Sequence, residues 1–333
     1  MAAGALNTCL PLLRLLADGR PHSGEALAEA LGISRAAVWK QIARLKNLGL
    51  KIDSRIGSGY RLSRPIEFLD RAFIARELNG PEGCSSRIEV FTEIDSTNSH
   101  LFSRERPAPG ELGVCLAEFQ RGGRGRRGRS WVAPLGGGLC LSLAWTFAAQ
   151  PADCGALGLA AGVVVRRVLE GLTGLKLKIK WPNDLIWEHR KLAGILVELS
   201  AEGHGPCLAV VGVGINVSMD STALDEIGSS GADAVDLASA MQGSSPSRNR
   251  LAVRLINELS MLLRSYDSTG FAPYLDELLA VDYLRGRGVK VLGDAHSVSG
   301  TAAGIAADGG LLVDTVEGVR KILSGEVSVR AMT

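Results

Sequence analysis

A short segment rich in glycine and arginine, GGRGRRGRSW at residues 122–131, most strongly restricts the folds open to this chain. Residues 123–128 have the G-x-G-x-x-G spacing of a turn that binds a dinucleotide between a strand and a helix. The apolar residues 113–119 predict the strand, but Pro134 and the glycines at 136–138 oppose a helix directly afterwards. The next acidic residue is Asp153, whereas such a turn needs one about 20 residues on. The pattern therefore argues against a hydride-transfer cofactor loop.

The bulk composition is that of a globular protein with more than one domain. The chain has 333 residues, of which 46% are hydrophobic and 22% are charged, so we expect two or three domains with substantial cores. The net charge is only +2, but residues 1–65 contain ten lysines and arginines against four acidic residues. This asymmetry favours a phosphate-rich partner at the amino-terminal end, and a solvated basic face is the alternative explanation.

The cysteines and the apolar segments predict a cytoplasmic location. The six cysteines, at positions 9, 84, 115, 140, 154 and 207, include no C-x-x-C pair, which is typical of free thiols in a reducing compartment. The apolar stretch at 5–17 lacks a basic start and contains Arg14, so it makes a poor signal peptide. No apolar run approaches the roughly 18 residues of a membrane span. We therefore expect no membrane partner.

Residues 22–62 have the pattern of a helix-turn-helix followed by a wing. Ser23 caps a first helix that ends at Gly32, and Ser34 caps a second helix over 35–48. Alternating residues on both sides of Gly57-Ser-Gly59 predict a hairpin. We expect this segment to bind DNA, and a small packing domain is the alternative. The candidates for DNA contact are Ser34, Arg35, Lys40 and Arg44.

Strand and helix signals alternate through the central region. The residues at 175–181 alternate between apolar side chains and lysines, which predicts a strand with one polar face. The residues at 190–194 are expected to connect two strands. The other expected strands are 88–92, 113–119, 139–146, 186–189, 195–200 and 207–213, and the expected helices are 96–102, 156–172 and 248–266.

Four stretches of this region carry groups suited to a nucleotide. The segment at 121–129, named the arginine loop, offers guanidinium groups for bidentate phosphate contacts. Lys180 precedes Asn183 and Asp184, an amide and a carboxylate that suit Mg²⁺. Lys191 stands beside an apolar strand, and residues 212–216 form a small-residue strand end that a ligand could approach closely. Each stretch alone fits an ordinary loop, turn or surface lysine. Together they predict a nucleotide site without a P-loop, because no G-x-x-x-x-G-K-[ST] occurs.

Five motifs resemble the biotin–protein ligases. They are DSTN (95–98), GRGRRGR (123–129), KWPND (180–184), KLAGILVE (191–198) and GINV (214–217). Residues 22–40 resemble the amino-terminal domain of the bifunctional members, which also repress biotin-synthesis genes. The resemblance implies an α/β multidomain fold. Its parts would be a winged helix-turn-helix at 1–64, a mixed α+β ligase domain similar to class II synthetases at 65–275, and a small SH3-like β-barrel at 276–333, with strands at 289–292, 298–305, 311–314 and 319–323.

The resemblance also implies a two-step activity and its partners. Biotin and MgATP would form biotinyl-5′-AMP, and a lysine of a biotin carboxyl carrier protein would then receive the biotin. The same adenylate would promote a homodimer that binds operator DNA. The alternatives are a ligase without operator binding, a DNA-binding regulator that only senses biotin, and a ligase for a related acid such as lipoate.

Residue roles follow from the matched motifs, with one departure. The residues implied to bind biotin are Ser96, Thr97, Asn98, Gln120, Arg124, Gly125, Arg126 and Lys191. Those implied for the nucleotide are Arg126, Arg127, Trp131, Asn183 and Asn216, with Asp184 and Asn183 holding the metal. The implied catalytic residues are Arg126, Lys191 and Lys180. Relatives can cover the adenine with an aromatic residue after the GIN segment, but residues 218–236 contain none.

Overall fold

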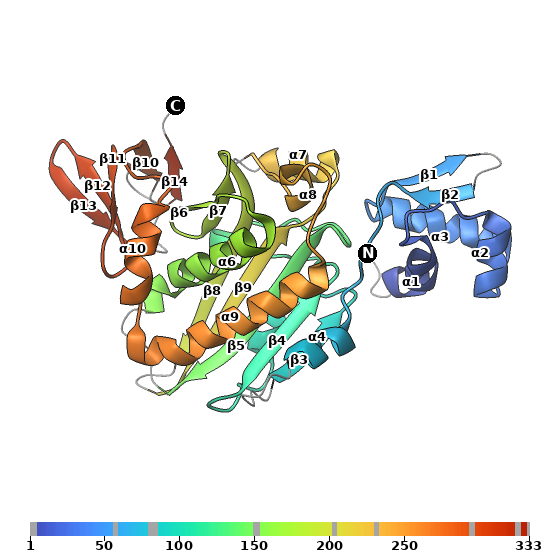
Figure 1. Ribbon diagram of the computed structural model, residues 1–333, viewed down its shortest axis with the longest axis horizontal. Helices are drawn as coiled ribbons and strands as arrows, with labels where there is room; N and C mark the ends of the chain where they lie inside the picture. Colours follow the sequence, from blue (N-terminus) through green and yellow to red (C-terminus); the bar gives the residue numbers. More distant parts are fainter. Residues whose placement is uncertain are drawn as a thin grey trace.

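Three sheets, each in a different stretch of the chain, organise the fold (Figure 1). A computed structural model describes residues 5–55, 59–78, 86–148, 154–201, 205–229, 233–292, 297–323 and 328–331. The first stretch pairs a two-stranded hairpin with helices, the second has a seven-stranded sheet, and the third has a five-stranded antiparallel sheet.

The amino-terminal part is a three-helix unit with a hairpin, of which the second and third helices and the hairpin were predicted. Its elements are α1 (Ala5–Leu16), α2 (Gly24–Leu31), α3 (Arg35–Asn47), β1 (Ile52–Arg55) and β2 (Gly59–Leu62). The Ser23 and Ser34 hydroxyls accept hydrogen bonds from backbone amides of the first turns of α2 and α3. Gly32 ends α2 with a left-handed φ of 63°, a conformation that glycine adopts without strain. Of the predicted turn at 57–59, residues 57 and 58 lie outside the described residues, and Gly59 begins β2.

Helix α1 of this part was not predicted from the sequence. Its apolar run was weighed only as a possible signal peptide, yet Leu12, Leu13 and Leu16 are fully buried in the same core cluster as Val38 and Leu45 of α3. A run of apolar residues is compatible with a leader or with a buried helix, and only the complementary face of α3 decides between them.

The central sheet is mixed, with strand order β3-β4-β5-β9-β8-β7-β6. Only β3 and β4 run parallel. The strands are β3 (Ser86–Phe91), β4 (Leu112–Ala117), β5 (Gly138–Phe147), β6 (Lys178–Lys180), β7 (Asp184–Trp187), β8 (Arg190–Ala201) and β9 (Cys207–Asn216). The helices of this part are α4 (Arg71–Leu78), α5 (Thr97–Ser103), α6 (Leu157–Thr173), α7 (Ser221–Ser229), α8 (Leu237–Ala240) and α9 (Arg248–Thr269), with short 3₁₀ turns η1 (Arg126–Gly128) and η2 (Cys154–Ala156).

Helices cover the two faces of this sheet unequally. Alternate residues of β5 and β9, such as Leu141 and Val211, are buried in one core cluster with α6 and α9. The intervening residues, such as Ala144 and Val210, pack with Leu101 of the short helix α5. Helix α5 covers only part of its face, and Trp131 and the loop at 122–130 approach the rest.

Two expectations for this sheet were wrong. The strand expected over 175–181 is limited to Lys178–Lys180, and Trp181 turns inward to donate a hydrogen bond to the Gly309 carbonyl at 2.9 Å. The residues at 190–194 are not a connection, because β8 already begins at Arg190. The chain reverses instead at Glu188 and His189, which have positive φ values of 44° and 71°. These residues lack the Asn-Gly chemistry that marks such a turn.

A buried network fixes the segment that leads from the amino-terminal part into the sheet. Arg248 of α9 donates to Glu118 Oε2 and to the Glu67 carbonyl, both at 2.7 Å, and the Arg248 and Glu118 side chains are almost completely buried. Glu118 also accepts from the Leu69 amide. The amino-terminal part therefore reaches the sheet through a connection that buried charges hold in place.

The carboxyl-terminal part consists of α10 (Ala272–Ala280) and a sheet of order β13-β12-β11-β10-β14. The strands are β10 (Gly288–Leu292), β11 (Ser297–Ile305), β12 (Leu311–Thr315), β13 (Gly318–Ile322) and β14 (Ser328–Ala331). The first four agree with the predicted strands, and β14 was not predicted. Among the described helices, none combines the length and the hydropathy that crossing a membrane requires.

Candidate active site

The open face of the central sheet is lined by small residues that lie side by side. Gly214 of β9 pairs with Cys140 of β5 and with Gly194 of β8, and Gly194 pairs with Asp184 of β7. Directly paired residues of antiparallel strands share a face. Lys180 of β6 pairs with Asp184 and extends the same row. The strand register therefore brings a lysine, a carboxylate and two glycines onto one face.

The glycines of this face make room for two of the protein's own side chains. A Cβ on Gly214 would lie 2.3 Å from Cε2 of Trp131, and a Cβ on Gly212 would lie 2.3 Å from Oδ1 of Asn98. At 212–216, where the sequence predicted the close approach of a ligand, the structure shows the close approach of Trp131 and Asn98. The indole Nε1 of Trp131 is buried without a well-formed hydrogen bond among the described residues, although its contact with the Cys140 thiol lowers the pKa of that thiol.

A buried polar cluster closes one end of this face. Ser96 caps α5 and so fixes the position of the next two residues. The Thr97 amide donates to Gln120 Oε1 at 2.7 Å, and the Ser142 hydroxyl lies 2.6 Å from both the Thr97 hydroxyl and Asn98 Oδ1. The structure thus brings together Ser96, Thr97, Asn98 and Gln120 as predicted. Ser142 was missed, although a serine within an apolar strand is a recognisable signal.

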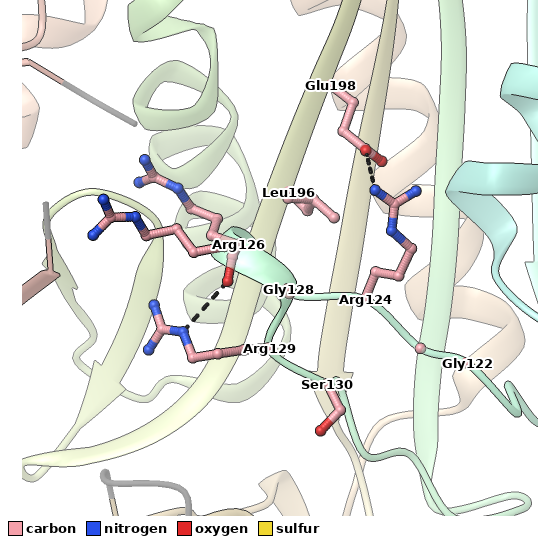
Figure 2. A pocket seen from close by; sticks show the side chains of 11 residues that line it. Gly122, Arg124, Arg126, Gly128, Arg129, Ser130, Leu196 and Glu198 are labelled. Carbon is pink, nitrogen blue, oxygen red and sulfur yellow. Dashed lines mark hydrogen bonds and ion pairs between the residues drawn. The ribbon is translucent and has the colours of Figure 1, made fainter. Parts of the chain in front are cut away.

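The arginine loop folds back on itself beside this cluster. The Gly125 amide donates to the Arg129 carbonyl at 2.7 Å, and the Trp131 amide donates to the Gly123 carbonyl at 2.8 Å. Residues 122–130 line a pocket of about 390 Å³ together with Leu196 and Glu198 of β8. Figure 2 shows that Arg124 extends toward Glu198, whereas Arg129 extends to the opposite side of the loop. The arginines therefore do not act as one cluster.

Lys191 and Arg126 form the cationic end of the site. Lys191 Nζ lies 2.7 Å from Asp184 Oδ1 and 5.5 Å from the centre of the Trp131 ring. Burial lowers the pKa of the Arg126 guanidinium, and the negative charge of Asp184 opposes this shift. The face as a whole thus suits a molecule with a neutral polar end, which the buried cluster would bind, and an anionic end.

The remaining predicted nucleotide residues have structural partners. Asn183 Nδ2 donates to the Ile195 carbonyl at 2.8 Å. Asn216 is fully buried, and its Nδ2 donates to the Val235 carbonyl at 3.0 Å. It therefore ties the segment around Val235 to the sheet, while its buried Oδ1 has no hydrogen-bond partner among the described residues. Arg127 lies in the loop with a positive φ of 57°.

The residues suited to Mg²⁺ form a partial site. Within the described ranges, no three His, Cys, Asp or Glu residues lie close enough together to hold a metal. Asp184 and the side-chain oxygen of Asn183 are therefore two candidate ligands on adjacent residues. This number fits Mg²⁺, which is commonly held by one or two carboxylates, several waters and the phosphates of the substrate.

The predicted DNA-contact residues of α3 differ in their surroundings. Arg35 and Lys40 are exposed, and the Ser34 hydroxyl serves as the helix cap. Arg44 lies close enough to the Cys9 thiol of α1 to lower the pKa of that thiol, although burial is the larger influence and raises it. Trp39, which the prediction left out, is 62% exposed on this helix.

Family models match three separate stretches of the chain. The model described as "Biotin/lipoate A/B protein ligase family" matches residues 90–216, "HTH domain" matches 10–61, and "Biotin protein ligase C terminal domain" matches 285–330. The fold and the site therefore define a protein ligase of the biotin and lipoate class that carries a helix-turn-helix domain.

Curated relatives and solved structures narrow this class. The bifunctional ligase/repressor BirA of Salmonella typhimurium is 39% identical over 97% of both chains, and that of Escherichia coli K12 is 38% identical over the same shares. The structure of a biotin protein ligase from Aquifex aeolicus, in complex with biotin and ATP, superposes with a TM-score of 0.63 at 29% identity. The matched region covers 74% of this chain and 99% of the Aquifex aeolicus chain. The chain belongs to the bifunctional ligase/repressor family of biotin protein ligases.

Proposed function

We propose that this chain activates biotin with ATP to biotinyl-5′-AMP and transfers the biotin to a lysine of the biotin carboxyl carrier protein of acetyl-CoA carboxylase. We further propose that it represses biotin-synthesis genes, with biotinyl-5′-AMP as corepressor. The observation that carries the proposal is that neutral polar groups and cationic groups lie at different ends of the site. The buried polar cluster lies against Gly212, and Lys191 with Asp184 lies against Gly194 near Arg126, which suits the neutral ring and the carboxylate of biotin.

In the first step, an oxygen of the biotin carboxylate attacks the α-phosphorus of ATP, and the bond to pyrophosphate breaks. Negative charge on the phosphoryl oxygens is stabilised by cations that are already in place. Lys191, held by Asp184 at 2.7 Å, and Arg126 are the groups suited to this role. Lys180 is in register with Asp184 on the same face and is proposed to assist.

In the second step, the amine of the carrier lysine attacks the acyl carbon of the adenylate. The carbon–oxygen bond to the phosphate breaks, AMP leaves, and the nitrogen loses a proton as the amide forms. The mixed anhydride must be kept from water until then. The arginine loop, with Arg124, Gly125, Arg126 and Arg127, lies beside the pocket and is proposed to cover it.

Mg²⁺ is proposed to accompany ATP. Asp184 and Asn183 would hold it, and it would neutralise phosphate charge during the attack. Trp131 and Asn216 are proposed to contact the nucleotide, because each has a buried polar atom without a well-formed hydrogen bond among the described residues.

The repressor role is proposed for the amino-terminal part. Its surplus of basic residues and the exposed Arg35 and Lys40 on α3 suit contact with DNA phosphates. A homodimer promoted by the adenylate would present two such helices to paired half-sites. The buried free thiols Cys115 and Cys140 accord with a cytoplasmic location.

The test combines two assays on one preparation. Radiolabelled biotin, ATP and Mg²⁺ should give biotin-dependent ATP–pyrophosphate exchange and label a carrier-protein lysine. With biotin and ATP present, the same protein should protect DNA upstream of biotin-synthesis genes, and its affinity should fall steeply with salt. Absence of exchange refutes the ligase. Exchange without protection supports the alternative, a ligase without operator binding. If lipoate competes with biotin and is itself attached to the carrier lysine, the protein is a ligase for lipoate instead.

A further inference from the structure

Glu198 connects two parts of the site through the two oxygens of one carboxylate. Its Oε1 accepts a hydrogen bond from Arg124 Nη2 at 2.7 Å, and its Oε2 accepts one from Asn98 Nδ2 at 2.9 Å. Arg124 belongs to the arginine loop, and Asn98 belongs to the buried polar cluster. The Glu198 side chain is 22% exposed and lines the pocket between them.

A chain of hydrogen bonds runs from the loop into the core through this carboxylate. The Ser142 hydroxyl lies 2.6 Å from Asn98 Oδ1 and also 2.6 Å from the Thr97 hydroxyl. Thr97 in turn donates to Gln120. Connected buried hydrogen bonds restrain one another more than isolated ones. The position of Arg124 is thereby linked to the orientation of the polar cluster.

Glu198 also cancels one positive charge of the loop. Arg124 donates only to Glu198 and to the Ser99 hydroxyl, at 3.1 Å, among the described residues. Figure 2 shows this pair on one side of the loop, with Arg129 on the other side. Arg124 is therefore compensated at the neutral end of the site, just as Lys191 is paired with Asp184 at the other end, where Arg126 adds a further positive charge.

We propose that Glu198 is a positioning residue that anchors the first half of the arginine loop to β8 and orients Asn98 for the neutral end of the substrate. The proposal rests on the proposed function for the identity of that substrate, biotin. The anchored half holds the pocket in shape, and the half that follows Gly125 is left to close over the reacting groups. A carboxylate is needed, because an amide at 198 cannot accept from both partners with the same geometry.

The experiment compares Glu198→Gln with a matched variant, Glu89→Gln. Glu89 has a similar exposure of 20% and pairs with His100 and Arg104, so its replacement makes the same charge change outside the pocket. Without any ligand, limited trypsin digestion should cut after Arg126 and Arg127 roughly five- to tenfold faster in Glu198→Gln, because charge-assisted contacts no longer hold the loop. Glu89→Gln should be cut at the wild-type rate.

The kinetic arm uses biotin-dependent pyrophosphate exchange. Glu198→Gln should raise KM for biotin about tenfold and leave kcat and KM for ATP within about twofold, a split that general damage to the fold would not produce. In an Arg124→Gln background, Glu198→Gln should speed trypsin cleavage by less than half as much as it does in the wild-type protein. This second background also decides the matter if Glu198→Gln alone is poorly folded, because Arg124→Gln should by itself speed cleavage after Arg126.

Digestion at the wild-type rate in both Glu198→Gln and Arg124→Gln overturns the anchor. Equal effects on biotin and ATP overturn the assignment to the neutral end of the substrate. If the wild-type protein shows no exchange, the proposed function fails, and the digestion still decides whether Glu198 holds the loop.

Discussion

Lys191 and Asp184, on the adjacent strands β8 and β7, form an ion pair with 2.7 Å between Nζ and Oδ1. Each side chain is about one-fifth exposed, and the ring of Trp131 lies beneath the ammonium group at 5.5 Å. A cation held in this way needs little rearrangement when charge develops on a bound phosphate. The pair therefore places a fixed positive charge at the proposed reacting end of the site.

Asp184→Asn is expected to lower the rate of adenylate formation about ten- to hundredfold, because the amide no longer orients Lys191 or offers a charged ligand to Mg²⁺. The concentration of Mg²⁺ that gives half the maximal pyrophosphate exchange should rise as well. Asp308→Asn, which removes an exposed carboxylate paired with Lys321 in the carboxyl-terminal sheet, is the control. A slower reaction with an unchanged Mg²⁺ requirement would show that Asp184 serves Lys191 alone.

Arg126→Gly is expected to release biotinyl-5′-AMP about ten- to a hundredfold faster, because charge-assisted hydrogen bonds to the intermediate are lost. The released adenylate should label lysines of an unrelated protein such as serum albumin. The variant Arg121→Gln serves as the comparison, since Arg121 pairs with Asp95 at 2.8 Å instead of lying near Asp184. Retention of the adenylate at the wild-type rate would remove Arg126 from its assigned role.

Gly214→Ala is expected to displace the Trp131 indole, because the new methyl group would lie 2.3 Å from its ring. Overpacking of this kind costs about 1–3 kcal/mol of stability, and pyrophosphate exchange should fall about tenfold or more as the ring leaves its place between Gly194 and Gly214. Tryptophan fluorescence and exchange kinetics report the two effects. Gly171→Ala on α6, where no atom lies within 4 Å, should leave exchange unchanged. Normal kinetics in Gly214→Ala would mean that the position of Trp131 is unimportant.

Alkaline pH is expected to destabilise the central sheet through Cys115 and Cys140. Burial raises the pKa of each thiol to about 12, whereas an unfolded cysteine titrates at about 8.5. The folded state therefore keeps its protons where the unfolded state loses them. Stability is complete below about pH 8.5 and falls by about 1.4 kcal/mol per thiol for each pH unit up to about 12. Urea midpoints at pH 7.5 and pH 10 measure this loss, and Cys115→Ala should reduce it. Equal losses in the variant and the wild type would contradict the assignment.

Local sequence signals predicted the amino-terminal part well, because each signal involves neighbours in the chain. Ser23, Gly32 and Ser34 act as helix caps through contacts that span three or four residues. The alternation of the carboxyl-terminal strands is local in the same sense. Helix α1 could not be assigned in this way, because the partners that bury it lie on α3.

In the site, too, local motifs could be recognised in the sequence, whereas contacts between distant residues could not. The motifs around Arg126, Asp184 and Lys191 could be recognised in the sequence, but Lys191 was expected in a connection and lies instead within β8. Its position opposite β7 comes from a turn at Glu188 and His189, and these residue types are not typical of a chain reversal. The role of Glu198 was invisible, although it falls within a recognised motif. Its partners Arg124 and Asn98 lie 74 and 100 residues away in the chain.

The sequence by itself determined which chemical groups the site contains and which local elements carry them, because caps, alternation and glycine loops depend on short-range sterics and hydrogen bonds. Only the tertiary structure decided which of those groups meet. The register of β5, β9, β8 and β7 places Gly214, Gly194 and Asp184 in one row, and register is a property of the whole packed sheet. The pairing of Arg124 with Glu198 of β8 likewise depends on the fold, because the two residues lie 74 positions apart in the chain.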